Sequence, residues 1–362
     1  MADDATGARQ NRVDPLTQHE GHGSGDEGNR HWRVSASDYP QRALDRDRWV
    51  LERRGERRPV DLWRPQGFFT EEEAAETGNV RSVVVILLTS RECPWRCVMC
   101  DLWQHTTVAN VPRGAIPAQI DFALSRLGPG AADGRHLKLY NSGSFFDARA
   151  VPPADHAAIA ERVARFDRVI VECHPALVGR AAAQFRDRLR PRLEVAVGLE
   201  TVNPRVLGLL NKRMTLDEFG RAAGFLSAQD IALRVFLLVA PPFLAESDGQ
   251  RWTEHSIDFA FGCGATAVSL NLTRPGNGAL EALADAGQFA TPRLAALERA
   301  LAYGLSRKHG RVFADLWSLD QFADCAACFP ARRERLRLMN VRQAPLPGVA
   351  CAVCGGMPPG EA

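Results

Sequence analysis

Short apolar runs alternate with longer amphipathic stretches in the middle of the chain. Six runs of apolar and β-branched residues predict strands, at 83–90, 136–140, 168–172, 193–200, 232–240 and 266–272. Stretches with apolar residues at helical spacing lie between them, at 116–127, 155–166, 175–189, 216–228 and 247–261. Alternating strands and helices are typical of parallel β–α–β units. Because the strand runs are continuously apolar, we expect both faces of the sheet to be covered.

A barrel and a doubly wound open sheet share this alternation. No GxGxxG or GxxxxGK[ST] sequence follows the first predicted strand, which disfavours a nucleotide-binding open sheet. We therefore predict an α/β fold, a partial (β/α)6 TIM-type barrel, over residues 80–310. A small C-terminal metal-binding region with four cysteines is predicted over residues 311–362. A segment of about fifty residues can scarcely build a hydrophobic core unaided, and a bound metal would supply the missing stability.

The N-terminal part of the chain has a different composition. Residues 1–38 lack periodic apolar positions, so we predict a disordered tail. Residues 39–79 are predicted to form a basic extension, in which the segment 39–64 carries eight arginines against five acidic residues. Trp49 and Trp63 are interleaved with these arginines. Such a segment is typical either of an RNA-binding surface or of a solvated helix packed on the barrel.

Composition narrows the class of protein. The 362 residues are 45% hydrophobic and 24% charged, which excludes fibrous and wholly disordered chains. The formal net charge of +2 excludes a strongly charged whole-molecule field. We find no secretory signal and no run of about 18 apolar residues that would span a bilayer, so we expect a cytoplasmic protein without membrane association. In a reducing compartment, clusters among the nine cysteines indicate metal sites rather than disulfides.

The first cysteine cluster, Cys93, Cys97 and Cys100, directly follows the first predicted strand. In an α/β barrel the active site lies at the carboxyl ends of the strands. Three thiolates spaced four and three residues apart can bind three irons of a [4Fe–4S] cluster and leave the fourth iron open to a substrate or cofactor. A structural zinc site would need a fourth ligand, and none lies nearby in the sequence.

The spacing CxxxCxxC after the first strand of a β/α repeat resembles the signature of the radical S-adenosylmethionine (radical SAM) enzymes. The resemblance implies that Cys93, Cys97 and Cys100 hold a [4Fe–4S] cluster whose open iron binds S-adenosylmethionine. It also implies that reductive cleavage of this cofactor gives a 5′-deoxyadenosyl radical, which abstracts a hydrogen atom from the substrate. Met99 takes the place of the aromatic residue that usually packs near the adenine.

Residues at other strand ends take cofactor-binding roles under this resemblance. Ser142, Gly143 and Ser144 occupy the GGE-like turn that usually holds the amine of the cofactor, although the acid of that turn is missing. Glu200, at the end of the fourth predicted strand, is implied to bind the ribose hydroxyls. Alternatively, Glu200 is an N-cap or first-turn acid of the following helix. Asn271, at the end of the sixth predicted strand, is a further polar candidate.

Three longer strings narrow the resemblance: LKLYNSGSFFD at 137–147, VAVGLETVNPRVLGLLNKRMT at 195–215 and RVFLLVAPPFLAE at 234–246. They resemble the elongator-catalytic-subunit type of radical SAM core, and most of all the archaeosine synthase radical SAM subunit and its uncharacterised relatives, over residues 80–354. Relatives of that subunit act on a modified deazaguanine base in tRNA. The resemblance therefore implies a nucleobase in RNA, in tRNA above all, as the substrate, and an electron donor such as a flavodoxin or ferredoxin.

Two other functions fit the same residues. One is radical SAM modification of a peptide or small molecule, with an auxiliary iron–sulfur cluster at the C-terminal cysteines. The other is a non-enzymatic iron–sulfur or zinc protein that binds RNA or senses redox state. Failure of the reconstituted cluster to bind the cofactor would favour the second of these.

The second cysteine cluster consists of Cys325, Cys328, Cys351 and Cys354, two CxxC pairs separated by 22 residues. Two such pairs complete a tetrahedral set of four thiolates around one metal. We favour zinc, which would make the region a structural ribbon, over a second [4Fe–4S] cluster, because four cysteines leave no open iron.

Two cysteines lie outside both clusters. Cys173 and its neighbour His174 follow the third predicted strand, at the end where the active site is expected. A thiol there could donate hydrogen or hold substrate, although inert buried cysteines are more common than reactive ones. Cys263, between two glycines, is interpreted as structural.

Overall fold

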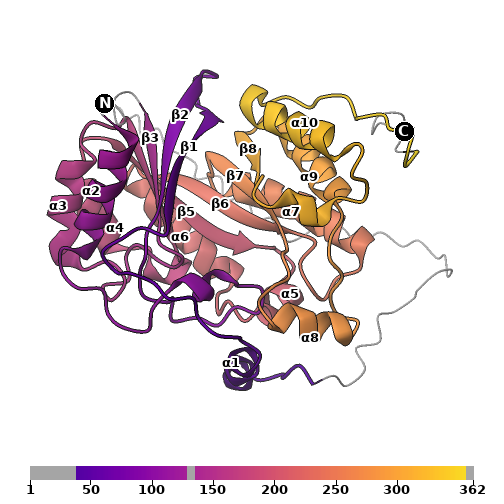
Figure 1. Cartoon of the computed structure of the whole chain (residues 1–362), viewed down its shortest axis with the longest axis horizontal. Coiled ribbons are helices and arrows are strands. Elements are labelled where there is room, and N and C mark those ends of the chain that lie inside the picture. Colours follow the sequence, from indigo (N-terminus) through magenta and orange to yellow (C-terminus); the bar gives the residue numbers. More distant parts are fainter. Residues whose placement is uncertain (1–37, 129–134, 356–362) are drawn as a thin grey trace, which may run out of the picture. The chain divides into compact units, whose positions relative to one another are not determined.

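The computed structural model describes residues 38–128 and 135–355, so residues 1–37 of the predicted tail lie outside the described part. The described residues form an eight-stranded sheet whose strands follow each other in sequence order (Figure 1). The strands are β1 Gly67–Ala74, β2 Val80–Leu87, β3 His136–Tyr140, β4 Arg168–Cys173, β5 Arg192–Glu200, β6 Ala232–Val239, β7 Ala267–Leu272 and β8 Arg311–Ala314. β1 pairs antiparallel with β2, and every later pair is parallel. The predicted α/β barrel class is confirmed.

Helices follow most of the parallel strands. They are α1 Ala43–Glu52, α2 Ala115–Leu127, α3 His156–Arg162, α4 Arg180–Arg186, α5 Pro204–Leu209, α6 Leu216–Ala228, α7 Glu246–Gly262, α8 Ala279–Asp285, α9 Leu294–Arg307 and α10 Phe329–Arg342. Short 3₁₀ helices lie at Leu102–His105, Pro153–Asp155, Pro175–Leu177 and Leu319–Phe322. In the view of Figure 1, α2, α3 and α4 lie to the left of the strands and α7, α9 and α10 lie to the right. No helix of the described residues is long and apolar enough to cross a membrane.

The sheet has two strands more than the six predicted, one at each end. β1 has the sequence GFFTEEEA, in which three consecutive acids hide the strand pattern, yet Glu73 is buried. β8 has only four residues and begins with a buried arginine. Both strands were missed because their buried polar side chains are stabilised by partners on other strands. β8 also extends the sheet past residue 310, where we placed the end of the barrel.

A buried ion-pair network lies near the amino ends of the parallel strands. Arg234 is fully buried, and its Nε donates to Glu194 Oε1 at 2.6 Å while its Nη2 donates to Glu73 Oε2 at 2.9 Å. Arg168 and Arg311 also pair with Glu194. Burial alone would raise the pKa of Glu194, but the three arginines hold it well below its usual range. The network joins β1, β4, β5, β6 and β8 and so ties both ends of the sheet to its middle.

Replacing Arg234 by alanine is expected to lower the free energy of unfolding by about 3–5 kcal/mol, because it leaves two buried carboxylates without their shared partner. Urea unfolding followed by circular dichroism measures the loss. The matched control is Arg251→Ala on α7, whose side chain is 62% exposed, with an expected change within about 0.5 kcal/mol. Because the folded-state pKa of Glu194 is depressed, its contribution is present above about pH 4.5 and is lost as the pH falls. A variant Arg234→Ala as stable as the control would contradict this role.

Helix α10 bridges the two ends of the sheet, since it contacts both β1 and β8. The side chain of Asn340 accepts from the backbone N–H of Ala314 and donates to its carbonyl, both at 2.8 Å. Leu336 and Met339 are fully buried in the same hydrophobic core as the strands. The C-terminal region therefore shares the core of the barrel rather than building its own.

Candidate active site and metal centre

The loop that carries Cys93, Cys97 and Cys100 begins at the carboxyl end of β2 and is fixed by hydrogen bonds from distant segments. The N–H of Val98 donates to the carbonyl of Leu210 at 3.0 Å. The side chain of Asn277 donates to the carbonyls of Val98 and Cys100, at 2.7 and 3.3 Å. The backbone of the loop is thus held at both its middle and its end.

The three thiols lie close enough to influence each other. Burial, together with a neighbouring thiol of the group, raises the pKa of each of Cys93, Cys97 and Cys100 to about 12. Cations oppose this effect: Lys212 acts on Cys93 and Cys97, and Arg54 acts on Cys100. A bound metal cluster would supply the positive charge that deprotonated thiols require here.

The N-terminal extension packs against this loop through Glu92, the residue before Cys93. Its carboxylate accepts from Arg54 Nη1 at 2.6 Å, pairs with Arg57, and lies 3.2 Å from Arg96 Nη1. Glu92 and Arg54 are almost completely buried. The start of the cluster loop is therefore tied to the extension by ion pairs centred on the buried carboxylate of Glu92.

The two tryptophans of the extension differ in their burial. Trp49 is buried beneath the guanidinium of Arg53, which lies 3.8 Å from its ring centre. Tyr39 packs edge-on against Trp49, and its hydroxyl donates to the carbonyl of Leu209. Trp63 is 50% exposed. Trp49 therefore packs on the barrel, and of these two tryptophans it is Trp63 that is exposed to solvent.

The predicted amine-binding turn lies at the carboxyl end of β3, against the cluster loop. A Cβ atom on Gly143 would lie 3.5 Å from Cys93 Cβ. Ser142 has a left-handed backbone conformation, with φ of 55°. Ser144 is buried, and its hydroxyl accepts from the N–H of His174 at 2.9 Å. Asn141 is fully buried, and its Oδ1 has no hydrogen-bond partner among the described residues.

Glu200 is the last residue of β5 and pairs with a lysine that the sequence analysis missed. Its backbone is left-handed, with φ of 69°, after a register shift that begins at Gly198. Lys212 Nζ donates to Glu200 Oε1 at 2.9 Å, and both side chains are about 10% exposed. Burial alone would lower the pKa of Lys212, but Glu200 and Cys97 raise it, so the ammonium stays charged. Asn203, not Glu200, caps the following helix, because its side chain accepts from the N–H of Val206.

His174 packs against the cluster loop, and its neighbour Cys173 is buried. The ring of His174 stacks on Trp95 of the loop, with 3.6 Å between ring centres. Its Nδ1 accepts from the N–H of Ala176 at 3.2 Å, so its Nε2 is the donor to the carbonyl of Lys212 at 2.9 Å. Burial and Lys212 lower the pKa of His174 to about 3, which keeps the ring neutral. The thiol of buried Cys173 donates to the carbonyl of His174.

The remaining candidates lie in less specific surroundings. Met99 packs against the apolar cluster that contains Tyr39 and Val98. Asn271 is half-buried near the carboxyl end of β7, opposite Leu238 of β6. Cys263 is half-buried after α7 and packs on the main core, as a structural residue would.

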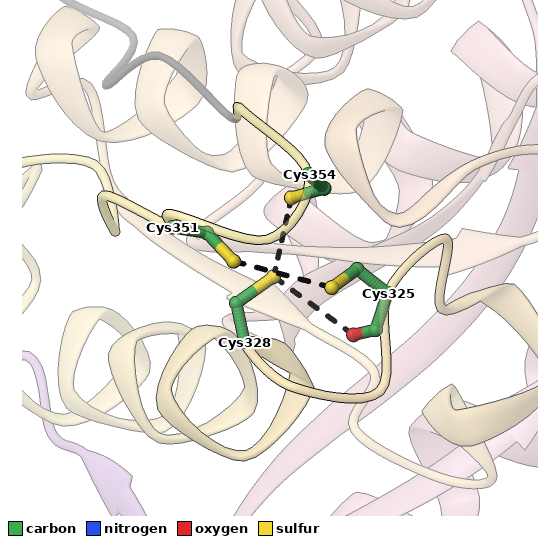
Figure 2. A group of neighbouring side chains, drawn as sticks. All are labelled: Cys325, Cys328, Cys351 and Cys354. Carbon is green, nitrogen blue, oxygen red and sulfur yellow. Dashed lines mark hydrogen bonds between the residues drawn. The ribbon is translucent and has the colours of Figure 1, made fainter.

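The four C-terminal cysteines converge on one point, as predicted (Figure 2). The sulfur atoms of Cys325, Cys328, Cys351 and Cys354 all lie within 4.8 Å of each other. The separations are 4.0 Å between Cys325 and Cys351 and 3.9 Å between Cys328 and Cys354. Four sulfurs about 2.3 Å from one tetrahedral ion lie about 3.8 Å apart. The set therefore fits a single ion such as zinc.

Removing a ligand from this site is expected to loosen α10, because Cys328 is the residue that precedes its first turn. The variant Cys351→Ser should lose bound zinc and show faster amide exchange in α10, while the central strands β4 and β5 keep their protection. Cys263→Ser is the matched control and should keep both. Zinc analysis and hydrogen exchange measure the two effects. A protein that carries iron and no zinc at these cysteines would contradict the assignment of zinc.

A parallel α/β barrel with CxxxCxxC at the carboxyl end of its first parallel strand is the arrangement that the resemblance to the radical SAM enzymes predicts. The chain is similar to archaeosine synthase subunit beta. It is 32% identical over 165 residues to that protein from Methanosarcina acetivorans, which covers 44% of this chain and 47% of the relative. It is 29% identical over 167 residues to that from Thermococcus kodakarensis, covering 44% and 51%. These relatives confirm the resemblance seen in the sequence.

A third relative is an uncharacterised protein of Methanocaldococcus jannaschii, 23% identical over 211 residues, which cover 55% of this chain and 58% of the relative. The chain thus spans about half the length of the curated relatives it matches. No family model matches the chain. Among solved structures, it is similar to Methanocaldococcus infernus Elp3, with a TM-score of 0.42 and 15% identity. The match covers 56% of this chain and 51% of the Elp3 chain. It is also similar to methylornithine synthase, with a TM-score of 0.47 and 14% identity. That match covers 71% of this chain and 68% of the synthase chain.

Proposed function

We propose that this chain is a radical SAM enzyme that modifies a nucleobase in tRNA. The observation that carries the proposal is the loop with Cys93, Cys97 and Cys100, fixed at the carboxyl end of the sheet beside the buried Lys212–Glu200 pair. A buried ammonium beside two of the three thiols is suited to a site that holds an anionic group.

The donor set fits a [4Fe–4S] cluster with S-adenosylmethionine. The three cysteines would hold three irons. Once bound, the cluster supplies an electron for reductive cleavage of the cofactor, which leads to hydrogen-atom abstraction from the substrate. The residues that would hold the cofactor are Met99, Asn141, Ser142, Gly143, Ser144, Glu200, Lys212 and Asn271. The unpartnered Oδ1 of Asn141 is a buried acceptor that an ammonium group would satisfy.

The surrounding residues supply the dry environment that radical chemistry needs. Val98 is fully buried in an apolar cluster with Trp49 and Val50 of the extension. The Glu92 ion pairs close the start of the same loop. Exclusion of water prevents side reactions of a reactive intermediate.

The RNA substrate is supported by the similarity to archaeosine synthase subunit beta and by two exposed tryptophans. Trp63 precedes β1, and Trp317 follows β8 and is 57% exposed. The start of β1 pairs with the end of β2, so both tryptophans lie at the same end of the sheet as the cluster loop. Exposed aromatic rings beside an active site are typical stacking surfaces for RNA bases.

Nucleoside analysis of tRNA tests the substrate. Cells that lack the gene should lose one modified nucleoside, and a cytoplasmic flavodoxin or ferredoxin should serve as the electron donor. Expression of the intact chain should restore that nucleoside, whereas expression of the variant Cys93→Ala should not. An unchanged set of tRNA nucleosides would exclude the tRNA substrate and favour a peptide or small molecule.

A further inference from the structure

The turn at 141–144 is bound from a neighbouring strand by the side chain of Glu172 of β4, and His174, directly after β4, donates to Ser144. Glu172 Oε1 accepts from the N–H of Asn141 at 2.6 Å and from the N–H of Gly143 at 3.3 Å. The backbone carbonyl of Glu172 accepts from the N–H of Phe145 at 2.9 Å. One residue therefore binds both the start and the end of the turn.

This turn also lies against the cluster loop. A Cβ atom on Gly143 would be 3.5 Å from Cys93 Cβ and 3.6 Å from Cys93 N. On its other side, Ser90 Oγ donates to the carbonyl of Asn141 at 2.7 Å. The position of the turn relative to Cys93 is thus determined by contacts with the loop and by the carboxylate of Glu172.

The conformation of the turn needs such support. Ser142 has φ of 55°, a left-handed conformation that costs a non-glycine residue energy and persists where the surroundings impose it. Burial raises the pKa of Glu172 to about 7, and the N–H groups of Gly143, Asn141 and Ser142 oppose this rise. The desolvation of this carboxylate is therefore offset by backbone donors of the turn, and the turn is shaped around the carboxylate.

We propose that Glu172 is a positioning residue for cofactor binding, which supplies from β4 the acid that the turn itself lacks. Its carboxylate binds the N–H groups on one side of the turn and leaves Asn141 Oδ1 as a free buried acceptor for the ammonium group of S-adenosylmethionine. The proposal rests on the radical SAM function proposed above. It differs from a general structural role because it acts on the turn rather than on the sheet.

The test uses the reconstituted full chain with S-adenosylmethionine as the probe. The variant Glu172→Gln should keep the iron content of the unmodified protein but bind S-adenosylmethionine about tenfold more weakly. KM for the cofactor should rise more than kcat falls, and the change that cofactor binding makes in the cluster's electron paramagnetic resonance spectrum should shrink. Asp167→Asn, an exposed carboxylate just before β4, is the matched control and should change none of these quantities.

A second variant tests whether Glu172 acts through the conformation of the turn. Ser142→Gly removes the cost of the left-handed conformation, so the double variant Glu172→Gln/Ser142→Gly should regain part of the lost affinity. If the unmodified protein holds its cluster but binds no S-adenosylmethionine, the proposed function fails. If it binds the cofactor and Glu172→Gln binds equally well, the role of Glu172 is overturned. The same holds if Ser142→Gly alone binds normally and the double variant shows no recovery.

Discussion

Replacing Cys97 by alanine is expected to abolish assembly of the iron–sulfur cluster. Cys97 is the middle ligand of three, and the backbone on either side of it is fixed by Asn211, which donates to the carbonyl of Arg96, and by Leu210, which accepts from Val98. A rigid loop cannot bring another residue into the vacant position. After anaerobic reconstitution, the intact protein should contain about four irons per chain with the matching sulfide, and Cys97→Ala should contain almost none.

The control for this substitution is Cys263→Ser, a half-buried cysteine outside both clusters, which should keep its full iron content. Zinc at the four C-terminal cysteines should be the same in all three proteins. A Cys97→Ala protein with an intact cluster spectrum would show that the three-cysteine loop is not the cluster site.

Replacing Lys212 by methionine is expected to make the cluster harder to reduce and the cofactor harder to bind. Lys212 is a buried cation beside Cys97 and Cys93, and it neutralises Glu200. Its loss leaves a buried carboxylate unpaired near an anionic cluster. A loss of about 1.4 kcal/mol of electrostatic stabilisation lowers the potential of a one-electron couple by about 60 mV, and we expect a shift of at least that size. Redox titration followed by electron paramagnetic resonance measures it.

Two control variants accompany the Lys212→Met prediction. Lys212→Arg keeps the charge and should keep most of the potential. Lys308→Met removes an exposed lysine on the surface and should leave the potential unchanged. Equal potentials for Lys212→Met and the intact protein would contradict an electrostatic role for this residue.

The six central strands, β2–β7, were predictable because each consists of a run of apolar residues that the local sequence shows directly. Val83, Val84 and Ile86 of β2, for example, are fully buried. The four-cysteine site was predictable because the spacing of its ligands is visible in the sequence. The four C-terminal sulfurs meet as the two CxxC pairs indicate.

The features that escaped prediction depend on partners far away in the chain. Glu73 made β1 look solvent-exposed, but it is buried because Arg234 and Lys138 lie against it. Glu172 looked like an ordinary strand residue. An acid at the end of an otherwise apolar strand is the one signal that could have marked it, since its role depends on the N–H groups of a turn 29 to 31 residues away. Tertiary charge pairing of this kind leaves no periodic trace.

The most direct test of the proposed chemistry is reductive cleavage of S-adenosylmethionine by the intact chain. Protein with a reconstituted cluster is mixed under anaerobic conditions with S-adenosylmethionine and dithionite, and the products are quantified by liquid chromatography. The proposed function predicts 5′-deoxyadenosine and methionine in equal amounts, with neither formed by Cys97→Ala. Unchanged S-adenosylmethionine in the presence of a fully loaded, reduced cluster would contradict it.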